Sequence, residues 1–279
     1  MSGLDLDLST EQAILRDAVQ RVLADVDCPD WDLLASQLGL AGLCLPEVLG
    51  GFAGGPIEVA LVMAELGPAL AGADWLSHSA ASGLLARVAP DHPALADLAR
   101  GSARAALVAP ETALDLPDAA AGGRVAGTVR QVAGGATADI FVVIAGATIA
   151  VVSSTDVRRS PRPLHDGSIA ADIAFDGARG EMHNDAAAAA AARDLVLAGR
   201  CAEATGLMQQ MLADTAGYLV ERRQFGVPIA TFQVLRHRLA DMQLVSLQAA
   251  GHIDEATAAR AVALDRGLVF SLHDELRLT

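Results

Sequence analysis

The feature that most constrains the fold is a break between two long helical segments near residue 225. From Ala186 to about Arg222 the sequence contains few helix breakers and is rich in Ala, the strongest helix former. About 35 residues at 1.5 Å each predict a rod of roughly 50 Å. Phe225-Gly226 and Pro228 then stop the helix, and a second amphipathic run follows. We therefore expect a long helix, a tight turn and a helix that returns antiparallel.

Apolar residues recur at helical spacing along the first rod and predict the stripe that it buries. The members of this stripe are Leu197, Cys201, Ala204, Met208, Leu212, Thr215 and Leu219. The lone glycines at 199, 206 and 217 would let neighbouring helices approach closely. A rod of this length needs partner helices to bury it.

The rest of the chain divides into a helical part and a β part. Residues 1–104 contain helix signals: a cap at Ser9 or Thr10, and apolar runs over 31–39, 57–66 and 77–88. Short β-type runs occupy 106–109, 125–129, 140–144, 149–152 and 172–176. We expect an α+β fold, mostly helical, with an N-terminal helical domain (1–104), a β domain (105–181) and a C-terminal helical domain (182–279).

Composition and charge exclude several classes of function. The chain has 279 residues, with 34 acidic against 20 basic side chains and a net charge of −14, which argues against nucleic acid and anionic membrane surfaces. No apolar stretch is long enough to cross a membrane, and the N-terminus lacks the features of a signal peptide, so we expect a cytoplasmic protein. The three cysteines are far apart and predict buried thiols rather than disulfides or metal ligands.

The segment Glu221-Arg222-Arg223-Gln224-Phe225-Gly226, with Phe232-Gln233 and His237 to Met242 behind it, resembles the signature of the acyl-CoA dehydrogenase family. The resemblance covers nearly the whole chain, with a weaker match at Leu45-Pro46-Glu47. It implies FAD as cofactor and a turn that reaches across a subunit interface. By resemblance, Arg222 neutralises the FAD pyrophosphate, Gln224 and Phe225 contact the adenosine half, and Gln233 adds a further cofactor contact.

Other parts of the family's active site have no counterpart in this sequence. The family removes two hydrogens from an acyl-CoA with a Glu base and a flavin held on a Trp-x-Thr platform. Gln131 and Ala133 stand at the platform positions, unless the loop is aligned incorrectly. Arg193 and His273 stand at the two Glu positions. No catalytic residue is therefore assigned, and Glu275 stays open as a weak candidate base through a register shift.

We call the four residues that resemble the family's FAD contacts (Arg222, Gln224, Phe225 and Gln233) the clamp. A chain that retains the clamp but lacks the base resembles the degenerate subunit of a two-plus-two heterotetramer. Such a chain lends FAD contacts to a homologous catalytic chain, with a bulky sterol side-chain CoA ester as substrate and an electron-transfer flavoprotein as acceptor. The C-terminal helical domain is short against the family pattern, since few residues separate Met242 from Gly267. Two alternatives stay open: a divergent, self-sufficient homomeric dehydrogenase that uses Glu275, and a helical scaffold or regulatory protein without cofactor.

Overall fold

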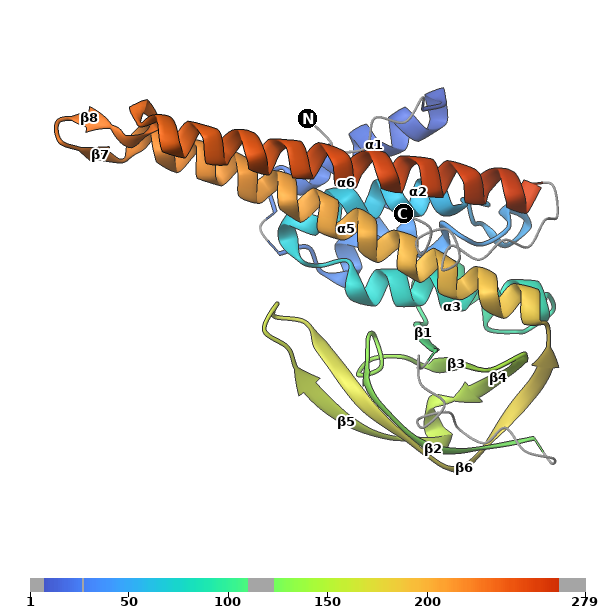
Figure 1. Cartoon of the computed structure of the whole chain (residues 1–279). Coiled ribbons are helices and arrows are strands. Elements are labelled where there is room, and N and C mark those ends of the chain that lie inside the picture. Colours follow the sequence, from blue (N-terminus) through green and yellow to red (C-terminus); the bar gives the residue numbers. More distant parts are fainter. Residues whose placement is uncertain (1–7, 27, 110–122, 266–279) are drawn as a thin grey trace.

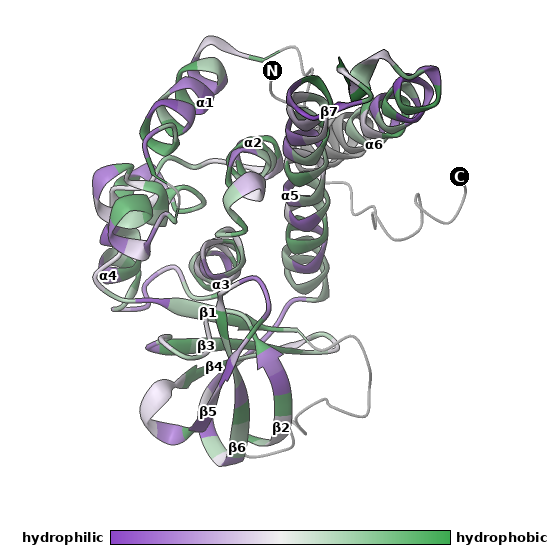
Figure 2. Cartoon of the chain, turned by 90° about the vertical axis from the view of Figure 1, so that its left-hand side faces the viewer, coloured by the Kyte–Doolittle hydropathy of each residue, from purple (hydrophilic) through white to green (hydrophobic). Residues whose placement is uncertain are grey.

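The computed structural model describes residues 8–26, 28–109 and 123–265. It has an α+β fold in which a layer of helices lies on a twisted sheet and a long helix pair runs along one side (Figures 1 and 2). The expected fold class is confirmed. Among the described helices, none is both long and apolar enough to cross a membrane.

The N-terminal layer contains four α-helices: α1 (Thr10–Leu23), α2 (Pro56–Leu66), α3 (Ala73–Val88) and α4 (Leu95–Arg100). The predicted cap of α1 is a full capping box, in which the Ser9 hydroxyl accepts from the Gln12 N–H and the Gln12 side chain accepts from the Ser9 N–H. Short turns join these helices: η1 (Leu33–Gln37), a π-helix, and the 3-10 turns η2 (Leu40–Gly42), η3 (Glu47–Leu49) and η4 (Gly67–Ala69). The helix expected over 31–39 is thus largely this π-helical turn.

The sheet has six strands in the order β1-β3-β4-β6-β2, with β5 beside β6. The strands are β1 (Ala105–Val108), β2 (Arg124–Val132), β3 (Ile140–Ala145), β4 (Thr148–Ser153), β5 (Arg158–Pro163) and β6 (Ile169–Asn184). β6 pairs antiparallel with β4, β2 and β5, so this one strand ties the sheet together. The sequence did not predict β5, because Pro161 and Pro163 argue against a strand; every residue of β5 is exposed.

The predicted pair of long helices is confirmed. α5 (Ala186–Glu221) has 36 residues and begins at Asp185, whose carboxylate accepts a hydrogen bond from the Ala188 N–H at 2.8 Å. A short hairpin, β7 (Arg223–Gln224) and β8 (Val227–Pro228), and the turn η7 (Ile229–Thr231) lead into α6 (Gln233–Asp265), a single helix of 33 residues.

The predicted buried stripe of α5 is wrong. Of its seven members only Leu219 is buried, Ala204 is exposed, and the others are partly buried. The buried side of α5 consists of small residues, chiefly Ala188, Ala189, Ala192, Ala198, Gly199, Ala202 and Gly206. A Cβ at Gly206 would lie 1.9 Å from the Ala64 carbonyl oxygen, so α5 and α2 meet at the backbone. Close approach, rather than side-chain size, decides which face of α5 is buried.

The layers are joined around His78 in α3, which is almost fully buried. Its Nδ1 accepts a hydrogen bond from the Ala105 N–H at 3.1 Å, and its Nε2 donates to the Ala41 carbonyl at 3.1 Å. The Trp31 ring meets the His78 ring edge to face at 4.9 Å. Burial lowers the pKa of His78 to about 4, so the side chain is uncharged at neutral pH. Its two hydrogen bonds link the helical layer to strand β1.

The prediction of three buried thiols is wrong for Cys28, which is exposed, while Cys44 and Cys201 are partly buried. Burial raises the pKa of the Cys44 thiol to about 12 and also raises that of Cys201, so both stay protonated at neutral pH. Within the described residues there is no group of three or more His, Cys, Asp or Glu side chains placed to hold a metal ion.

Candidate functional site

The candidate site is the β7–β8 hairpin, which lies at the end of the α5–α6 pair and projects beyond the rest of the chain (Figure 1). Phe225 and Gly226 form its two-residue loop, with φ values of 54° and 81°. Positive φ at both loop positions matches the right-handed twist of a hairpin. Such a φ is strained for Phe, since a bulky residue rarely adopts the left-handed conformation.

The backbone of Arg222 is held by two hydrogen bonds, and the residue is exposed. Its N–H donates to the Tyr218 carbonyl at 2.9 Å, and its own carbonyl accepts from the Ile229 N–H at 2.8 Å. Arg222 and its neighbour Arg223 are exposed, and neither forms an ion pair with a described residue. Two guanidinium groups are therefore presented to solvent on an anchored turn, where their charges are available to an anion.

Phe225 presents an aromatic face beside these cations. Its side chain is 91% exposed, and the Phe232 ring supports it edge to face at 6.3 Å between centroids. Gln224 is also exposed and pairs through its backbone with Val227. Gln233, the first residue of α6, lies exposed at the same end of the helix pair. The structure thus brings Arg222, Gln224, Phe225 and Gln233 to one tip.

This donor set fits part of a dinucleotide. A guanidinium forms charge-assisted hydrogen bonds with a phosphate oxygen, an amide supplies donor and acceptor groups to a base edge, and an aromatic ring offers a stacking face. All four side chains are exposed in this chain, so the tip leaves them accessible to a ligand.

The positions expected to replace the flavin platform lie at the end of β2 and at the start of its connection to β3. Gln131 sits in a β-bulge with φ 54°, is exposed, and donates its N–H to Asp172 at 3.1 Å. Three residues after Gln131, the Gly134 N–H donates to the Asp74 carboxylate of α3 at 2.8 Å, and burial raises the pKa of Asp74. Neither Gln131 nor Ala133 offers an aromatic ring or a hydroxyl to a flavin.

Of the residues expected at the base positions, Arg193 alone lies within the described residues. Arg193 lies in the first half of α5 and is partly buried. Its neighbour Asp194, which no motif of the sequence marks, is a buried carboxylate. His273 and Glu275 lie outside the described residues.

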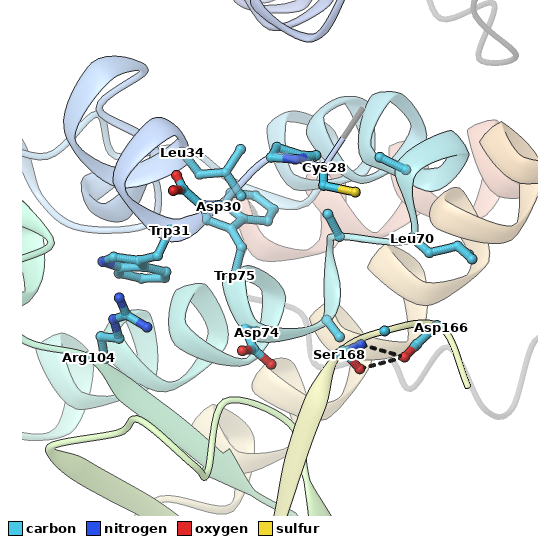
Figure 3. A pocket seen from close by; sticks show the side chains of 15 residues that line it. Cys28, Asp30, Trp31, Leu34, Leu70, Asp74, Trp75, Arg104, Asp166 and Ser168 are labelled. Atoms are coloured by element: carbon cyan, nitrogen blue, oxygen red, sulfur yellow. Dashed lines mark hydrogen bonds between the residues drawn. The ribbon is translucent and has the colours of Figure 1, made fainter. Parts of the chain in front are cut away.

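The structure also contains a half-open cavity of about 290 Å³ under the N-terminus of α3, which the sequence did not predict (Figure 3). The turn after η4, the segment around Trp31 and the β5–β6 turn enclose it. Its polar side chains are Asp30, Asp74, Arg104, Asp166 and Ser168. Arg104 stacks on the Trp31 ring at 4.7 Å, and Asp166 accepts both the N–H and the hydroxyl of Ser168. Three carboxylates against one guanidinium make this cavity unsuited to an anionic phosphate group.

Comparison with known proteins decides the family. The acyl-CoA dehydrogenase FadE28 of Mycobacterium tuberculosis is 35% identical over 260 residues, which cover 87% of this chain and 74% of FadE28. The family model of the acyl-CoA dehydrogenase C-terminal domain matches residues 198–266, which include the hairpin. The chain belongs to the acyl-CoA dehydrogenase family.

This chain covers between about two thirds and four fifths of the length of other acyl-CoA dehydrogenases that resemble it. IpdE2 of M. tuberculosis is 34% identical over 243 residues, which cover 84% of this chain and 64% of IpdE2. A solved chain of the ChsE4-ChsE5 complex from the same organism has the same fold, with a TM-score of 0.83 at 24% identity over 92% of this chain and 80% of that one. The butyryl-CoA dehydrogenase of Megasphaera elsdenii gives 0.77 at 19% identity, over 95% and 82%.

Proposed function

We propose that this chain is a subunit of a flavin-dependent acyl-CoA dehydrogenase and lends FAD-binding residues to a homologous catalytic chain. The observation that carries the proposal is the hairpin, which projects beyond the helical body and exposes Arg222, Gln224 and Phe225 on an anchored backbone. In this proposal the clamp at the projecting tip holds a ligand that is bound mainly by another chain.

In the proposed assembly each residue at the tip has one task. Arg222 neutralises the pyrophosphate of FAD through its planar fork of donors. Phe225 covers the adenosine half, Gln224 hydrogen-bonds to it, and Gln233 closes the site from the start of α6. Bound FAD supplies the hydride acceptor for α,β-dehydrogenation of the acyl-CoA. The proton acceptor comes from the partner chain, since Arg193 stands at one base position of this one.

The helical body supports a non-catalytic role. A Cβ at Gly199 would lie 2.6 Å from Leu76 Cδ1, and one at Gly67 would lie 2.3 Å from the Glu203 carbonyl oxygen. Glycines at these positions hold α5 against η4 and α3 with no room for an acyl chain between them. In the proposed assembly we therefore place the substrate on the partner's side.

The relatives favour a bulky substrate and a mixed assembly. One solved chain of the same fold, with a TM-score of 0.78 at 22% identity, comes from Tcur3481-Tcur3483, named as a steroid acyl-CoA dehydrogenase, and ChsE4-ChsE5 is named as a complex. By that analogy we propose a two-plus-two heterotetramer, a sterol side-chain CoA ester as substrate and an electron-transfer flavoprotein as acceptor. In the proposed division (1–104, 105–181, 182–279), the third domain carries the clamp.

The proposal is tested by co-expressing this chain with candidate partner chains of the acyl-CoA dehydrogenase family from the same genome. Native mass and the flavin absorbance spectrum are measured for each chain alone and for the pair. We expect one FAD per pair of unlike chains and no flavin on this chain alone. A yellow, active preparation of this chain alone would contradict the proposal and direct attention to Glu275. A colourless pair would instead support a scaffold without cofactor.

A further inference from the structure

Both tryptophans of the chain, Trp31 and Trp75, line the half-open cavity under the N-terminus of α3. Their indole N–H groups are already used, since Trp31 donates to the Gly101 carbonyl and Trp75 to the Leu40 carbonyl, each at 3.0 Å. The buried Leu34 lies in the same wall. This part of the cavity therefore offers apolar and aromatic carbon atoms to a ligand and no indole donor.

Among the described residues that line the cavity, Arg104 carries the one positive charge. Its backbone is anchored, because its N–H donates to the Asp139 carboxylate at 2.9 Å and its carbonyl accepts from the Asp139 N–H at 2.8 Å. The guanidinium stacks on the Trp31 ring at 4.7 Å and forms no ion pair with a described residue. A stacked guanidinium keeps the N–H donors in its plane, so Arg104 has donors left for an acceptor in the cavity.

The carboxylates of the cavity have acceptor atoms left over. Asp74 accepts the Gly134 N–H at 2.8 Å, and Asp166 accepts the N–H and the hydroxyl of Ser168 at 3.0 and 2.7 Å, in each case through Oδ1. Asp30 also uses its Oδ1 for a backbone N–H. The Oδ2 atom of each carboxylate has no hydrogen bond to a described residue. Ionised carboxylates only accept hydrogen bonds, so these atoms suit a cationic donor.

The two kinds of charge lie in different parts of the cavity. In Figure 3 Arg104 lies beneath the Trp31 ring, Asp166 lies at the opposite side beside Ser168, and Asp74 lies between them. Burial raises the pKa of Asp74, and the charge of Asp166 adds to this rise, so the two carboxylates are close enough to repel each other. A positive group between them would relieve that repulsion.

Size and charge together select the class of ligand. A volume of about 290 Å³ is at the small end for ligand pockets, which excludes a molecule as large as a CoA thioester. A simple cation would leave the donors of Arg104 without an acceptor, and a simple anion would face three carboxylates. A small molecule that carries both charges and an apolar group satisfies all three parts of the lining.

We propose that this cavity binds a small zwitterion of the amino-acid class with an apolar side chain. Its carboxylate pairs with Arg104, its ammonium group lies between Asp74 and Asp166, and its side chain packs against Trp75. The site uses none of the clamp residues, so it adds a ligand to the chain beyond the proposed function.

The test measures intrinsic tryptophan fluorescence, which reports on this cavity because both tryptophans line it. The purified chain is titrated with L-leucine, with isoamylamine, which is leucine without its carboxylate, and with isocaproate, which is leucine without its ammonium group. We expect a saturable change with leucine and an affinity about tenfold or more lower for each analogue, the loss of one charge-assisted contact.

Variants assign the two charged contacts. Arg104→Gln should weaken leucine by about tenfold and leave isoamylamine unchanged, whereas Asp166→Asn should weaken both. The control is Arg130→Gln, an exposed arginine of β2 outside the cavity, which should change neither affinity. Circular dichroism melting checks that each variant is folded. If Arg104→Gln does not fold, Asp166→Asn and the two analogues still decide the result.

Two results would overturn the proposal. If isoamylamine binds as tightly as leucine and Arg104→Gln has no effect, the cavity is a site for simple cations. If none of the three probes gives a saturable change in fluorescence, the cavity is no site for this class of ligand. Neither result bears on the clamp, which is tested by flavin content.

Discussion

The two halves of α5 use different side chains for different tasks. The inner half, up to Gly206, buries alanines and glycines against α2 and α3 at backbone distance. The outer half exposes Met211, Tyr218 and Val220 and ends at the hairpin. The inner half is thus specified by packing within its own chain, whereas most of the outer half is exposed in this chain. Because both halves belong to one uninterrupted helix, packing of the inner half fixes where the hairpin lies relative to the helical body.

The largest effect that we expect belongs to the inner region and depends on pH. His78 has a folded-state pKa of about 4 against about 6.5 in an unfolded chain, because burial opposes its charge. Its contribution to stability is complete above pH 6.5 and is lost as the pH falls toward 4, by about 3 kcal/mol in total. Urea unfolding at pH 7.5 and 4.5 checks this. His78→Gln should remove this part of the pH dependence; an equal slope in wild type and variant would contradict it.

A Gly→Ala substitution should change the free energy of unfolding in opposite directions in the inner and outer halves of α5. Gly206→Ala places a Cβ 1.9 Å from the Ala64 carbonyl oxygen, which forces the two helices apart. We expect a loss of about 2 kcal/mol, as for overpacked cores. The free energy of unfolding from urea titration measures it, and an unchanged value would show that α2 and α5 are not in backbone contact.

The matched change in the outer half should act in the opposite direction. Gly217 is helical and exposed, and a Cβ there meets nothing within 4 Å. Gly217→Ala should stabilise the isolated chain by about 0.5–1 kcal/mol, because Ala restricts the unfolded chain and favours helix. The same titration reports it. Destabilisation would mean that the outer half of α5 is packed against its own chain.

The smallest expected change in stability lies at the hairpin loop and should separate stability from function. Phe225→Gly removes a side chain from a φ of 54°, relieving strain on the order of 1 kcal/mol while losing the edge contact with Phe232. We expect a melting temperature equal to or slightly above that of wild type, together with a lower flavin content in the pair. A clear loss of stability with full flavin content would reverse the assignment.

Local signals in the sequence predicted the elements well, because their causes are local. The Ser9-Gln12 capping box, the Phe225-Gly226 turn and the uninterrupted α5 could all be predicted from neighbouring residues. The buried face of α5 could not, because Met208 and Leu212 looked more apolar than Gly206, and only the closeness of α2 makes Gly206 the buried residue. β5 was hidden by its prolines, which an edge strand tolerates. The cavity beside Trp31 brings together segments more than 130 residues apart, and no local pattern marks it.

The candidate clamp was predicted by resemblance, and the structure adds its exposure and its anchored backbone. Donation of the clamp is tested by the affinity of the assembled pair for FAD, measured by fluorescence titration of the apo-pair. Arg222→Ala should weaken it by about tenfold to a hundredfold, the loss of one charge-assisted contact to phosphate. Arg179→Ala, an exposed arginine of β6, should leave it unchanged. Equal affinity for FAD in wild type and Arg222→Ala would contradict the donated clamp.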